Sequence, residues 1–425
     1  MEKNSVLIIG AGISGLIAAR ILIREGIQVG ILEARERIGG RIMTFRQGEQ
    51  ILEGGPEFIH GRLKETLSLL KEYRIPFVKT AGKAYYFRSG HFVENMEDDW
   101  DMLIKKMKTV KTDLPFMQFL LENFEGEEFR NLRESAIGFA EGFDLADVHT
   151  VSTISLIREW EIEESTQYRI PGGYGQIMIA LADEFTSSGG RLLLNRPVAK
   201  LKWSKGRVEI STTDNHKFRA DKVIITIPVA VLNHFQNDDY DVSFSPDILT
   251  RRVALRQIGF GTAIKVLLQW KTAFWKTIVP DAQFIFSDKD IPTWWTQSPA
   301  DTNVLTGWVG GRAAEGLSEF TEKELLNIAI ENLSSMFGMQ PAELNAQLLS
   351  AKCVNWKKEI FTRGAYSYTL AGQEAARAIW KEPLEKTLYF AGEACYQGPH
   401  GGTVEAAIIS GMETARELLK EYKTT

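Results

Sequence analysis

Three glycines near the N-terminus have the spacing of a turn that holds a phosphate-bearing ligand. The stretch GAGISG, residues 10–15, follows the apolar run VLII and leads into a segment, 14–25, with apolar residues at helical intervals. In such a strand–turn–helix, the first glycine makes the tight turn, the second lets the backbone approach a pyrophosphate, and the third lets helix and strand meet. The helix N-terminus adds free N–H groups. The pattern predicts a dinucleotide site at Gly10, Gly12, Ile13, Ser14 and Gly15.

Glu33 indicates which dinucleotide is held. It ends a second predicted strand, 28–33, and follows Gly15 by 18 residues. A carboxylate there accepts from a ribose hydroxyl and repels a 2′-phosphate, which favours NAD or FAD over NADP. The next stretch, ARERIGGRI, resembles the RxGGR extension of flavoproteins in the glutathione-reductase and amine-oxidase group. This resemblance favours FAD and implies cofactor contacts from Ala34, Arg35, Gly39, Gly40 and Arg41.

Lys265 lies in GFGTAIKVLLQW, residues 259–270, whose two faces are both largely apolar. The pattern predicts a buried strand, and a lysine in a buried strand needs a partner. Two interpretations remain open from the pattern alone. The amine either reaches the surface along its aliphatic stem or holds a water near a flavin.

A second glycine-rich helix entry lies near the C-terminus, in residues 389–415. The stretch predicts a buried strand, a turn at Gly392 and Glu393, and a helix from about Thr403, with Val404 beginning its apolar face. A helix N-terminus directed at the N1–C2=O edge of a flavin would stabilise the anionic reduced ring. Glu393 would accept from ribityl or phosphate-side hydroxyls. Two such entries in one chain indicate a large cofactor.

Composition weighs against several other functions. The 425 residues are 44% hydrophobic and 25% charged, with a net charge of −5 and no stripe of Lys and Arg, so no nucleic-acid partner is expected. Six histidines, none at paired-ligand spacing, predict no metal site. Two cysteines cannot form a disulfide framework, which favours a reducing, cytoplasmic location. The apolar segment 6–23 contains three glycines and Arg20, so we do not interpret it as a membrane helix.

The length and the motifs predict an α/β fold with two interleaved domains. One is a Rossmann-type FAD-binding domain of the glutathione-reductase and amine-oxidase group, formed by residues 1–78, 170–245 and 352–425. The other is an α+β substrate-binding domain, formed by residues 79–169 and 246–351.

Each predicted domain has a distinct pattern. The cofactor domain contains a turn and helix at 171–185, two strands within 189–203 and a buried strand, 220–232, that is ended by Pro228. In the substrate domain, the first segment is polar and helical in pattern. The second segment holds strands, aromatic residues and a helix at 322–337.

The motifs together resemble the flavin-dependent amine oxidase family, which includes monoamine oxidase, polyamine oxidase and L-amino acid oxidase. The resemblance covers essentially the whole chain in order. It rests on GAGISGL, EARERIGGRI, EGGPEFIHG, the Lys265 strand, NWKKEIFTRGAYSY, FAGEA and TVEAAIISG. It implies noncovalent FAD, because Ala365 stands where monoamine oxidases have the cysteine that bonds to the flavin.

The resemblance also implies roles around the flavin ring. Lys265 would bond a water that contacts flavin N5, Trp356 would lie beside the ring, and Tyr366 would form one wall of an aromatic cage. Thr403 replaces the tyrosine of the opposite wall. His60 would orient or deprotonate the amine, or would be a polar residue satisfied within its turn.

The stretch LEGGPEFIHG, residues 52–61, would run beside the flavin ring in the same family, and Val198 is at the place where the backbone contacts adenine. Many amino acid oxidases have a carboxylate-binding arginine near this stretch. Here Phe58 stands in its place, which weighs against an amino acid substrate. The cofactor contacts implied in this part are Gly54, Gly55, Pro56, Glu57 and Val198.

The implied reaction is the oxidation of a mono- or polyamine. Hydride passes to flavin N5, water hydrolyses the imine to an aldehyde or ketone, and O2 reoxidises the flavin and yields H2O2; the flavin carries the hard step. Alternatives are an L-amino acid oxidase, a flavin-dependent desaturase or isomerase of the same fold, and an FAD-binding scaffold or demethylase subunit. The expected partners are a small amine and O2, without a membrane, and a homodimer remains open.

Overall fold

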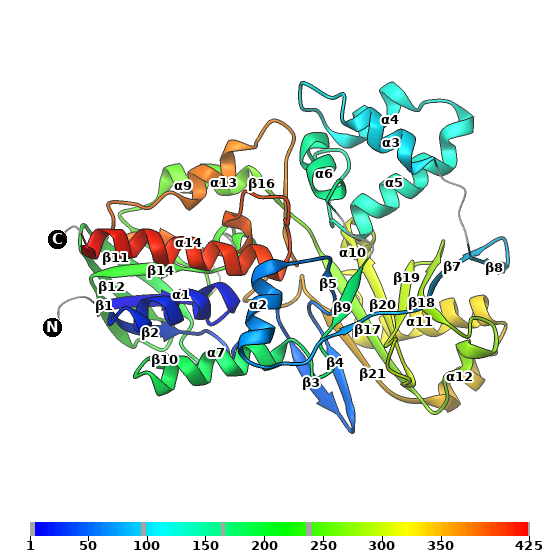
Figure 1. Ribbon diagram of the computed structural model, residues 1–425, viewed down its shortest axis with the longest axis horizontal. Coiled ribbons are helices and arrows are strands. Elements are labelled where there is room, and N and C mark those ends of the chain that lie inside the picture. Colours follow the sequence, from blue (N-terminus) through cyan, green and yellow to red (C-terminus); the bar gives the residue numbers. More distant parts are fainter. Residues whose placement is uncertain (1–4, 95–98, 163–165, 235–239, 424–425) are drawn as a thin grey trace.

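The computed structural model describes residues 5–94, 99–162, 166–234 and 240–423. The first strand, β1 (Ser5–Ile9), and the end of the last helix, α14 (Val404–Lys423), lie at one edge of the molecule, where β1 belongs to a five-stranded parallel sheet (Figure 1). Its strands come from three distant parts of the sequence. In spatial order they are β10 (Arg191–Leu193), β2 (Gln28–Leu32), β1 (Ser5–Ile9), β14 (Lys222–Ile225) and β23 (Leu388–Phe390).

Two layers cover this parallel sheet. One layer consists of the helices α1 (Ile13–Arg24), α7 (Gly175–Ser187) and α14 (Val404–Lys423), whose apolar side chains share one core with the sheet. The other layer is a four-stranded sheet that shares a second core with it. Its strands in spatial order are β13 (Lys217–Ala220), β12 (Arg207–Thr212), β11 (Val198–Ser204) and β15 (Ser243–Ser245).

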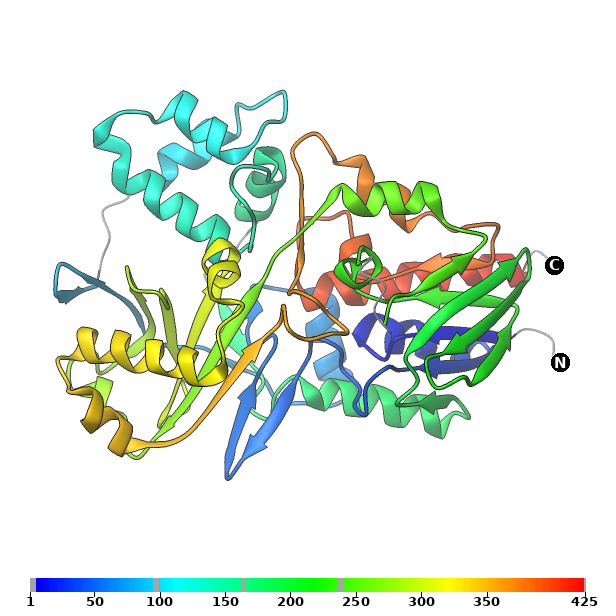
Figure 2. The same ribbon diagram turned by 180° about the vertical axis from the view of Figure 1, so that it is seen from behind.

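A seven-stranded, mostly antiparallel sheet forms the end of the molecule opposite the termini (Figure 2). Helices α11 (Glu322–Phe337) and α12 (Pro341–Gln347) pack against it around a core rich in tryptophan and phenylalanine. The strands in spatial order are β21 (Leu348–Asn355), β17 (Ala263–Trp270), β20 (Val304–Gly310), β19 (Thr293–Thr296), β18 (Ala282–Ser287), β7 (Lys83–Arg88) and β8 (His91–Val93).

Four helices form a lobe with its own apolar core beside this sheet (Figure 1). They are α3 (Trp100–Met107), α4 (Phe116–Asn123), α5 (Arg130–Gly142) and α6 (Thr153–Trp160). Helix α6 begins at a capped turn, because the Ser152 side chain accepts from the backbone N–H of Ser155. We call this group of four helices the helical lobe.

Shorter elements connect these parts. The strands β3 (Thr44–Gln47) and β4 (Gln50–Glu53) form a hairpin. The strands β5 (Ile59–His60) and β6 (Val78–Lys79) both pair with β9 (Gln167–Arg169). The remaining elements are α2 (Lys64–Glu72), η1 (Glu127–Phe129), α8 (Val229–Leu232), α9 (Leu249–Arg256), β16 (Ile258–Phe260), η2 (Phe274–Thr277), α10 (Gly311–Leu317), β22 (Ser367–Thr369), α13 (Ala375–Lys381) and η3 (Glu393–Cys395).

This architecture confirms the predicted α/β class, and β1, β2, β17, α1 and α11 lie where the sequence predicts them. Two local predictions are wrong. Residues 79–169 are not only helical, because β7 and β8 join the seven-stranded sheet and bury Tyr85 and Phe87 in its core. Residues 220–232 are not one strand, because β14 ends at Ile225 and the helix α8 follows Pro228.

The division into two domains stays a prediction, and the packing bears on two of its boundaries. Helix α9 and strand β16 contribute to the core beneath the four-stranded sheet, although the predicted boundary precedes them at 245/246. Strand β21 pairs with β17 along its length, although the predicted boundary divides it at 351/352. Strand β21 and the segment from α9 to β16 are therefore each packed as one unit, although the predicted boundaries would divide β21 and assign α9 and β16 to the substrate domain.

Candidate active site

A cavity of about 2200 Å³ lies between the parallel sheet, the seven-stranded sheet and the helical lobe. Small-ligand pockets usually have about 300–1,000 Å³, so this cavity has room for a dinucleotide and a second molecule. Every residue predicted for the site lines it, except Gly15 and Gly54. The lining residues predicted from the sequence are Gly10, Gly12, Ile13, Ser14, Glu33, Ala34, Arg35, Gly39, Gly40, Arg41, Gly55, Pro56, Glu57, His60, Val198, Lys265, Trp356, Tyr366, Gly392, Glu393, Thr403 and Val404.

The three glycines of the first turn have different surroundings. Gly10 has a φ of +107°, and a Cβ there would overlap Oγ1 of Thr226. A Cβ on Gly15 would overlap the carbonyl oxygen of Gly10, so this glycine serves close packing within the turn. Gly12 faces open space in the cavity and caps α1 without a side-chain hydrogen bond. The first N–H groups of α1 are therefore free for a phosphate, which fits a dinucleotide.

Glu33 braces this turn from the end of β2. Its buried carboxylate accepts from the backbone N–H of Ala11 at 2.7 Å and from that of Arg35 at 3.0 Å. A carboxylate has about four acceptor positions, so two backbone donors leave capacity for a ribose hydroxyl. The geometry is compatible with the predicted ribose contact and adds a structural role for Glu33.

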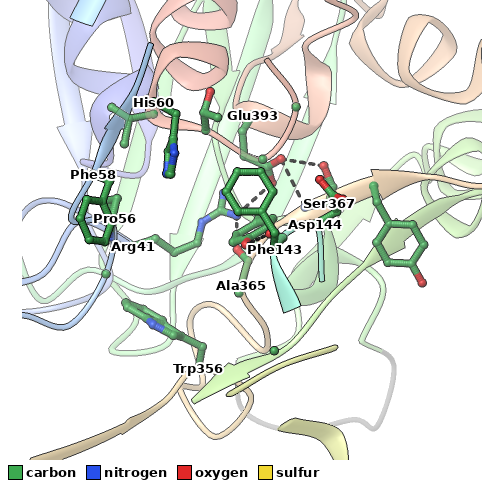
Figure 3. A pocket seen from close by; sticks show the side chains of 18 of the residues that line it. Arg41, Pro56, Phe58, His60, Phe143, Asp144, Trp356, Ala365, Ser367 and Glu393 are labelled. Atoms are coloured by element: carbon green, nitrogen blue, oxygen red, sulfur yellow. Dashed lines mark hydrogen bonds and ion pairs between the residues drawn. The ribbon is translucent and has the colours of Figure 1, made fainter. Parts of the chain in front are cut away.

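The RIGGRI stretch folds against the first turn. Gly39 bridges to Gly12 as an isolated parallel pair, and Gly39 and Gly40 have φ of +106° and +59°. Arg37 closes the stretch, because its guanidinium donates to the carbonyl of Gly40 at 3.0 Å. Arg41 is directed into the cavity, where it pairs with Glu393 at 2.9 Å and donates to the carbonyl of Ala365 (Figure 3).

Glu393 lies at the other side of this ion pair. It accepts from the Ser367 hydroxyl at 2.6 Å and from Arg41, and it is buried. Burial would raise the pKa of Glu393, but the charges of Arg41 and Arg377 outweigh it and lower that pKa. Glu393 is therefore an anion that is paired with Arg41 and stabilised by the nearby charge of Arg377, and the sequence did not indicate Arg377 or Ser367.

Lys265 does not reach the surface, so that interpretation is wrong: the residue is 1% exposed. Its ammonium donates to the carbonyls of Glu53 at 2.8 Å and Gly55 at 2.9 Å and to Oε2 of Glu57 at 2.8 Å. A lysine has three N–H donors, so all are directed at protein oxygens. The predicted flavin-side water would have to displace one of these partners.

Glu57 is the centre of a buried cluster that the sequence analysis did not foresee. Its carboxylate accepts from Lys265, from Arg169 at 2.8 Å, and from the side chains of Trp295 and Gln297, each at 3.0 Å. Burial would raise the pKa of Glu57, but Lys265 and Arg169 outweigh it and lower that pKa to about 2. We call these five residues the Glu57 cluster.

His60 is a neutral side chain within the cavity wall. Burial lowers its pKa to about 4. Its Nδ1 lies 3.3 Å from Nε2 of Gln167, and the edge of its ring meets Phe143 at a centroid distance of 5.1 Å. Phe58 is the residue that stands in place of an arginine. Its ring packs under the guanidinium of Arg169, with 4.4 Å between Cζ of Arg169 and the ring centroid.

Two aromatic residues line the cavity beyond Arg41. The Trp356 indole donates to the carbonyl of Gly54 at 3.0 Å, which gives that glycine a structural role. The Tyr366 hydroxyl donates to the carbonyl of Phe143, and burial raises the pKa of Tyr366 well above its usual value. Thr403 accepts from the backbone N–H of Ala406 at 3.2 Å, so its hydroxyl caps α14.

The helical lobe supplies cavity residues that the sequence analysis missed. They come from α5, from the residues that directly follow it and from α6, and the two helices show only an ordinary amphipathic pattern in sequence. The main ones are Glu141, Phe143, Asp144, Ser155, Leu156 and Glu159.

The described part of the chain contains no group of three or more His, Cys, Asp or Glu side chains placed to hold a metal ion. Among its described helices, none has the length and apolarity to cross a membrane.

Comparison with known proteins connects this geometry to a family. Residues 13–419 match the family described as flavin containing amine oxidoreductase. Polyamine oxidase 4 of Oryza sativa subsp. japonica is 26% identical over 98% of this chain and 88% of its own length. Lysine-specific histone demethylase 1B of Mus musculus is 25% identical over 98% of this chain, which spans only 53% of the length of that protein.

Solved structures show the same fold. Putrescine oxidase bound to putrescine has a TM-score of 0.82 at 21% identity, with 98% of this chain and 99% of that chain covered. Cyclohexylamine oxidase from Brevibacterium oxydans has a TM-score of 0.80 at 20% identity, with 99% and 100% covered. Together with the match over residues 13–419, these findings confirm the predicted family and its flavin cofactor: the chain belongs to the flavin-containing amine oxidoreductases.

Proposed function

We propose that this enzyme oxidises a small mono- or polyamine with noncovalently bound FAD. Bound FAD would accept hydride from the amine carbon at N5 and pass the electrons to O2, which yields H2O2. Water then hydrolyses the resulting imine to an aldehyde or ketone and releases ammonia or the shortened amine.

The observation that carries this proposal is the continuity of one cavity from the glycine turn to the aromatic residues. Gly12 and the first N–H groups of α1 would hold the pyrophosphate, Glu33 the ribose, and Val198 would contact adenine. Trp356 and Tyr366 line the far part of the same cavity. This arrangement supports a large cofactor with a second, mostly apolar compartment beyond it.

The residues around that second compartment favour an amine substrate. Trp356 and Tyr366 present aromatic surface that excludes water from the reacting carbon. His60 is neutral at pH 7 because its pKa is about 4, so it adds no positive charge to repel a cationic substrate. The small Ala365 lines the cavity where a linking cysteine would be required for a covalent flavin.

The same residues weigh against an amino acid substrate. An L-amino acid oxidase needs a cation for the substrate carboxylate. Arg169, whose guanidinium packs on the Phe58 ring, is already bound to Glu57 and to the carbonyl of Thr296 at 2.7 Å. Releasing that arginine would leave Glu57 partly uncompensated in a buried site, which is costly.

A peroxide-coupled screen of the purified yellow protein tests the proposal. One portion of the protein is acid-precipitated to see whether its flavin is released, and monoamines, polyamines and L-amino acids are added in turn to the untreated enzyme. We expect flavin in the supernatant and amine-dependent peroxide. Peroxide with L-amino acids alone would support the amino acid oxidase. Flavin that no amine reduces, even without oxygen, would overturn the proposal in favour of a desaturase, an isomerase or a scaffold.

A further inference from the structure

Helix α6 presents one acidic side chain to the cavity. Ser155, Leu156 and Glu159 all line the cavity from this helix, and Glu159 is partly buried. The Ser155 hydroxyl donates to Oε1 of Glu159 at 3.3 Å. Within the described residues, no Lys or Arg nitrogen lies within 4.0 Å of this carboxylate. Glu57 and Glu393, by contrast, both form ion pairs within the protein.

Glu159 lies next to the aromatic end of the cavity. A Cβ on Gly401 would come within 2.8 Å of its Oε1, so the glycine leaves room for the carboxylate. The next residue, Gly402, packs against the Tyr366 ring, where a Cβ would be 2.6 Å from Cδ2. The negative charge of Glu159 also contributes to the raised pKa of Tyr366. The carboxylate and the aromatic ring therefore border the same compartment.

An amine substrate needs a proton acceptor in this compartment. An alkyl ammonium ion has a pKa of roughly 10, like that of lysine, so the amine arrives as a cation. Its nitrogen must lose a proton before its lone pair can assist the departure of hydride. His60 is a weak base there because its pKa is about 4. Asp144 is held by the Trp160 indole at 2.8 Å.

Glu159 has the chemistry that this step requires. Burial raises its pKa to about 7, the charge of Arg377 and the bond from Ser155 oppose that rise, and the charge of Glu393 adds to it. Tyr366 and Tyr396 are the other titratable groups that interact with it. A base with a pKa near the working pH takes and returns protons readily.

We propose that Glu159 binds the ammonium group of the incoming amine beside Tyr366 and removes one of its protons. The step converts an alkylammonium ion and a carboxylate into a neutral amine and a carboxylic acid, and the acid later releases its proton to solvent. This inference rests on the proposed amine oxidation. It adds the residue through which a cationic substrate is recognised and made reactive.

The test is Glu159→Gln in the FAD-loaded enzyme, with the amine that the peroxide screen finds most active. In the unmodified enzyme, kcat/KM should rise with pH through a limb near pH 7, because only the ionised carboxylate accepts a proton. The variant should lose that limb and about 100-fold or more of kcat/KM. The unmodified enzyme should also show a fall in kcat/KM near pH 10, where the free amine loses the proton that Glu159 is proposed to recognise. FAD content should be unchanged.

Two further variants make the test specific. Glu122→Gln is the same exchange on the exposed surface of α4, outside the cavity, and should leave kcat/KM unchanged. Gly401→Ala should lower kcat/KM, because its methyl group would displace the Glu159 carboxylate. In a double variant with Glu159→Ala, Gly401→Ala should cause no further loss of kcat/KM, because the effects of coupled sites are not additive.

The outcomes separate this inference from the proposed function. If the unmodified enzyme oxidises an amine but Glu159→Gln keeps both its kcat/KM and the limb near pH 7, the role of Glu159 is overturned and the function stands. If no amine reduces the flavin of the unmodified enzyme, the proposed function fails first.

Discussion

Replacing Glu57 by glutamine should lower the free energy of unfolding by about 3 kcal/mol at pH 7, because it removes the anion that compensates two buried cations. The magnitude follows from the Glu57 cluster. The pKa of Glu57 falls from 4.5 to about 2 in the folded protein, and one pKa unit corresponds to about 1.4 kcal/mol. Breaking a buried pair by removing one partner costs about 3–5 kcal/mol in general, so the two routes agree.

The pH dependence of this loss has a definite sign. The folded pKa of Glu57 is depressed, so its stabilisation is complete above the unfolded value of 4.5 and is lost as pH falls through about 2. The difference in stability between the unmodified protein and Glu57→Gln should therefore shrink from about 3 kcal/mol at pH 7 to about 2 kcal/mol at pH 3.5.

Denaturant unfolding followed by tryptophan fluorescence measures this difference, since Trp295 contacts Glu57 at 3.0 Å. Glu122→Gln on the exposed face of α4 is the matched control and should have no effect. A Glu57→Gln variant as stable as the unmodified protein would refute the reasoning. So would a loss that stays the same between pH 7 and pH 3.5.

Three other substitutions test individual parts of the site. Gly12→Val should leave the fold intact, because its Cβ would enter open space. It should weaken FAD binding about 10-fold or more, which corresponds to about 1.4 kcal/mol. A normal flavin content in titrations of the apoprotein would contradict this. Lys265→Met should keep FAD and slow turnover, and an unchanged rate of flavin reduction and reoxidation would exclude a catalytic role. Ala365→Cys should place a thiol at the cavity wall and retain part of the flavin in the acid-precipitated pellet; complete release into the supernatant would show that the residue does not reach the ring.

Local patterns in the sequence predict the cofactor half of the site well, because the groups involved are neighbours in the chain. Gly10, Gly12 and Gly15 lie within six residues, and the strand and helix on either side have clear periodicity. The same reasoning locates β17, since burial on both faces leaves an apolar run around Lys265. In each case the physical constraint acts within one turn or one strand.

The Glu57 cluster could not be predicted in this way. Glu57 is separated by 112 residues from Arg169 and by 238 from Trp295. These residues come into contact only because the fold brings β5, β9 and β19 together, and no local sequence pattern indicates that arrangement. Arg169 lies in a short strand whose residues look like an ordinary edge segment. The interpretation of Lys265 as a surface-reaching amine failed for the same reason, since its partners were invisible in the sequence.

The distribution of charge around the cavity explains how Glu159 differs from Glu57 and Glu393. A buried carboxylate is costly unless a cation and hydrogen bonds compensate it, and Glu57 and Glu393 have both. Their positive partners are thereby neutralised, so neither Arg41 nor Lys265 offers an uncompensated charge to an anionic substrate. Glu159 has one hydroxyl bond and a pKa near 7, so the arrival of a cation removes the cost of ionising it. The second compartment is therefore matched to a cationic substrate, because a bound ammonium ion would supply the positive charge that pairs with the Glu159 carboxylate.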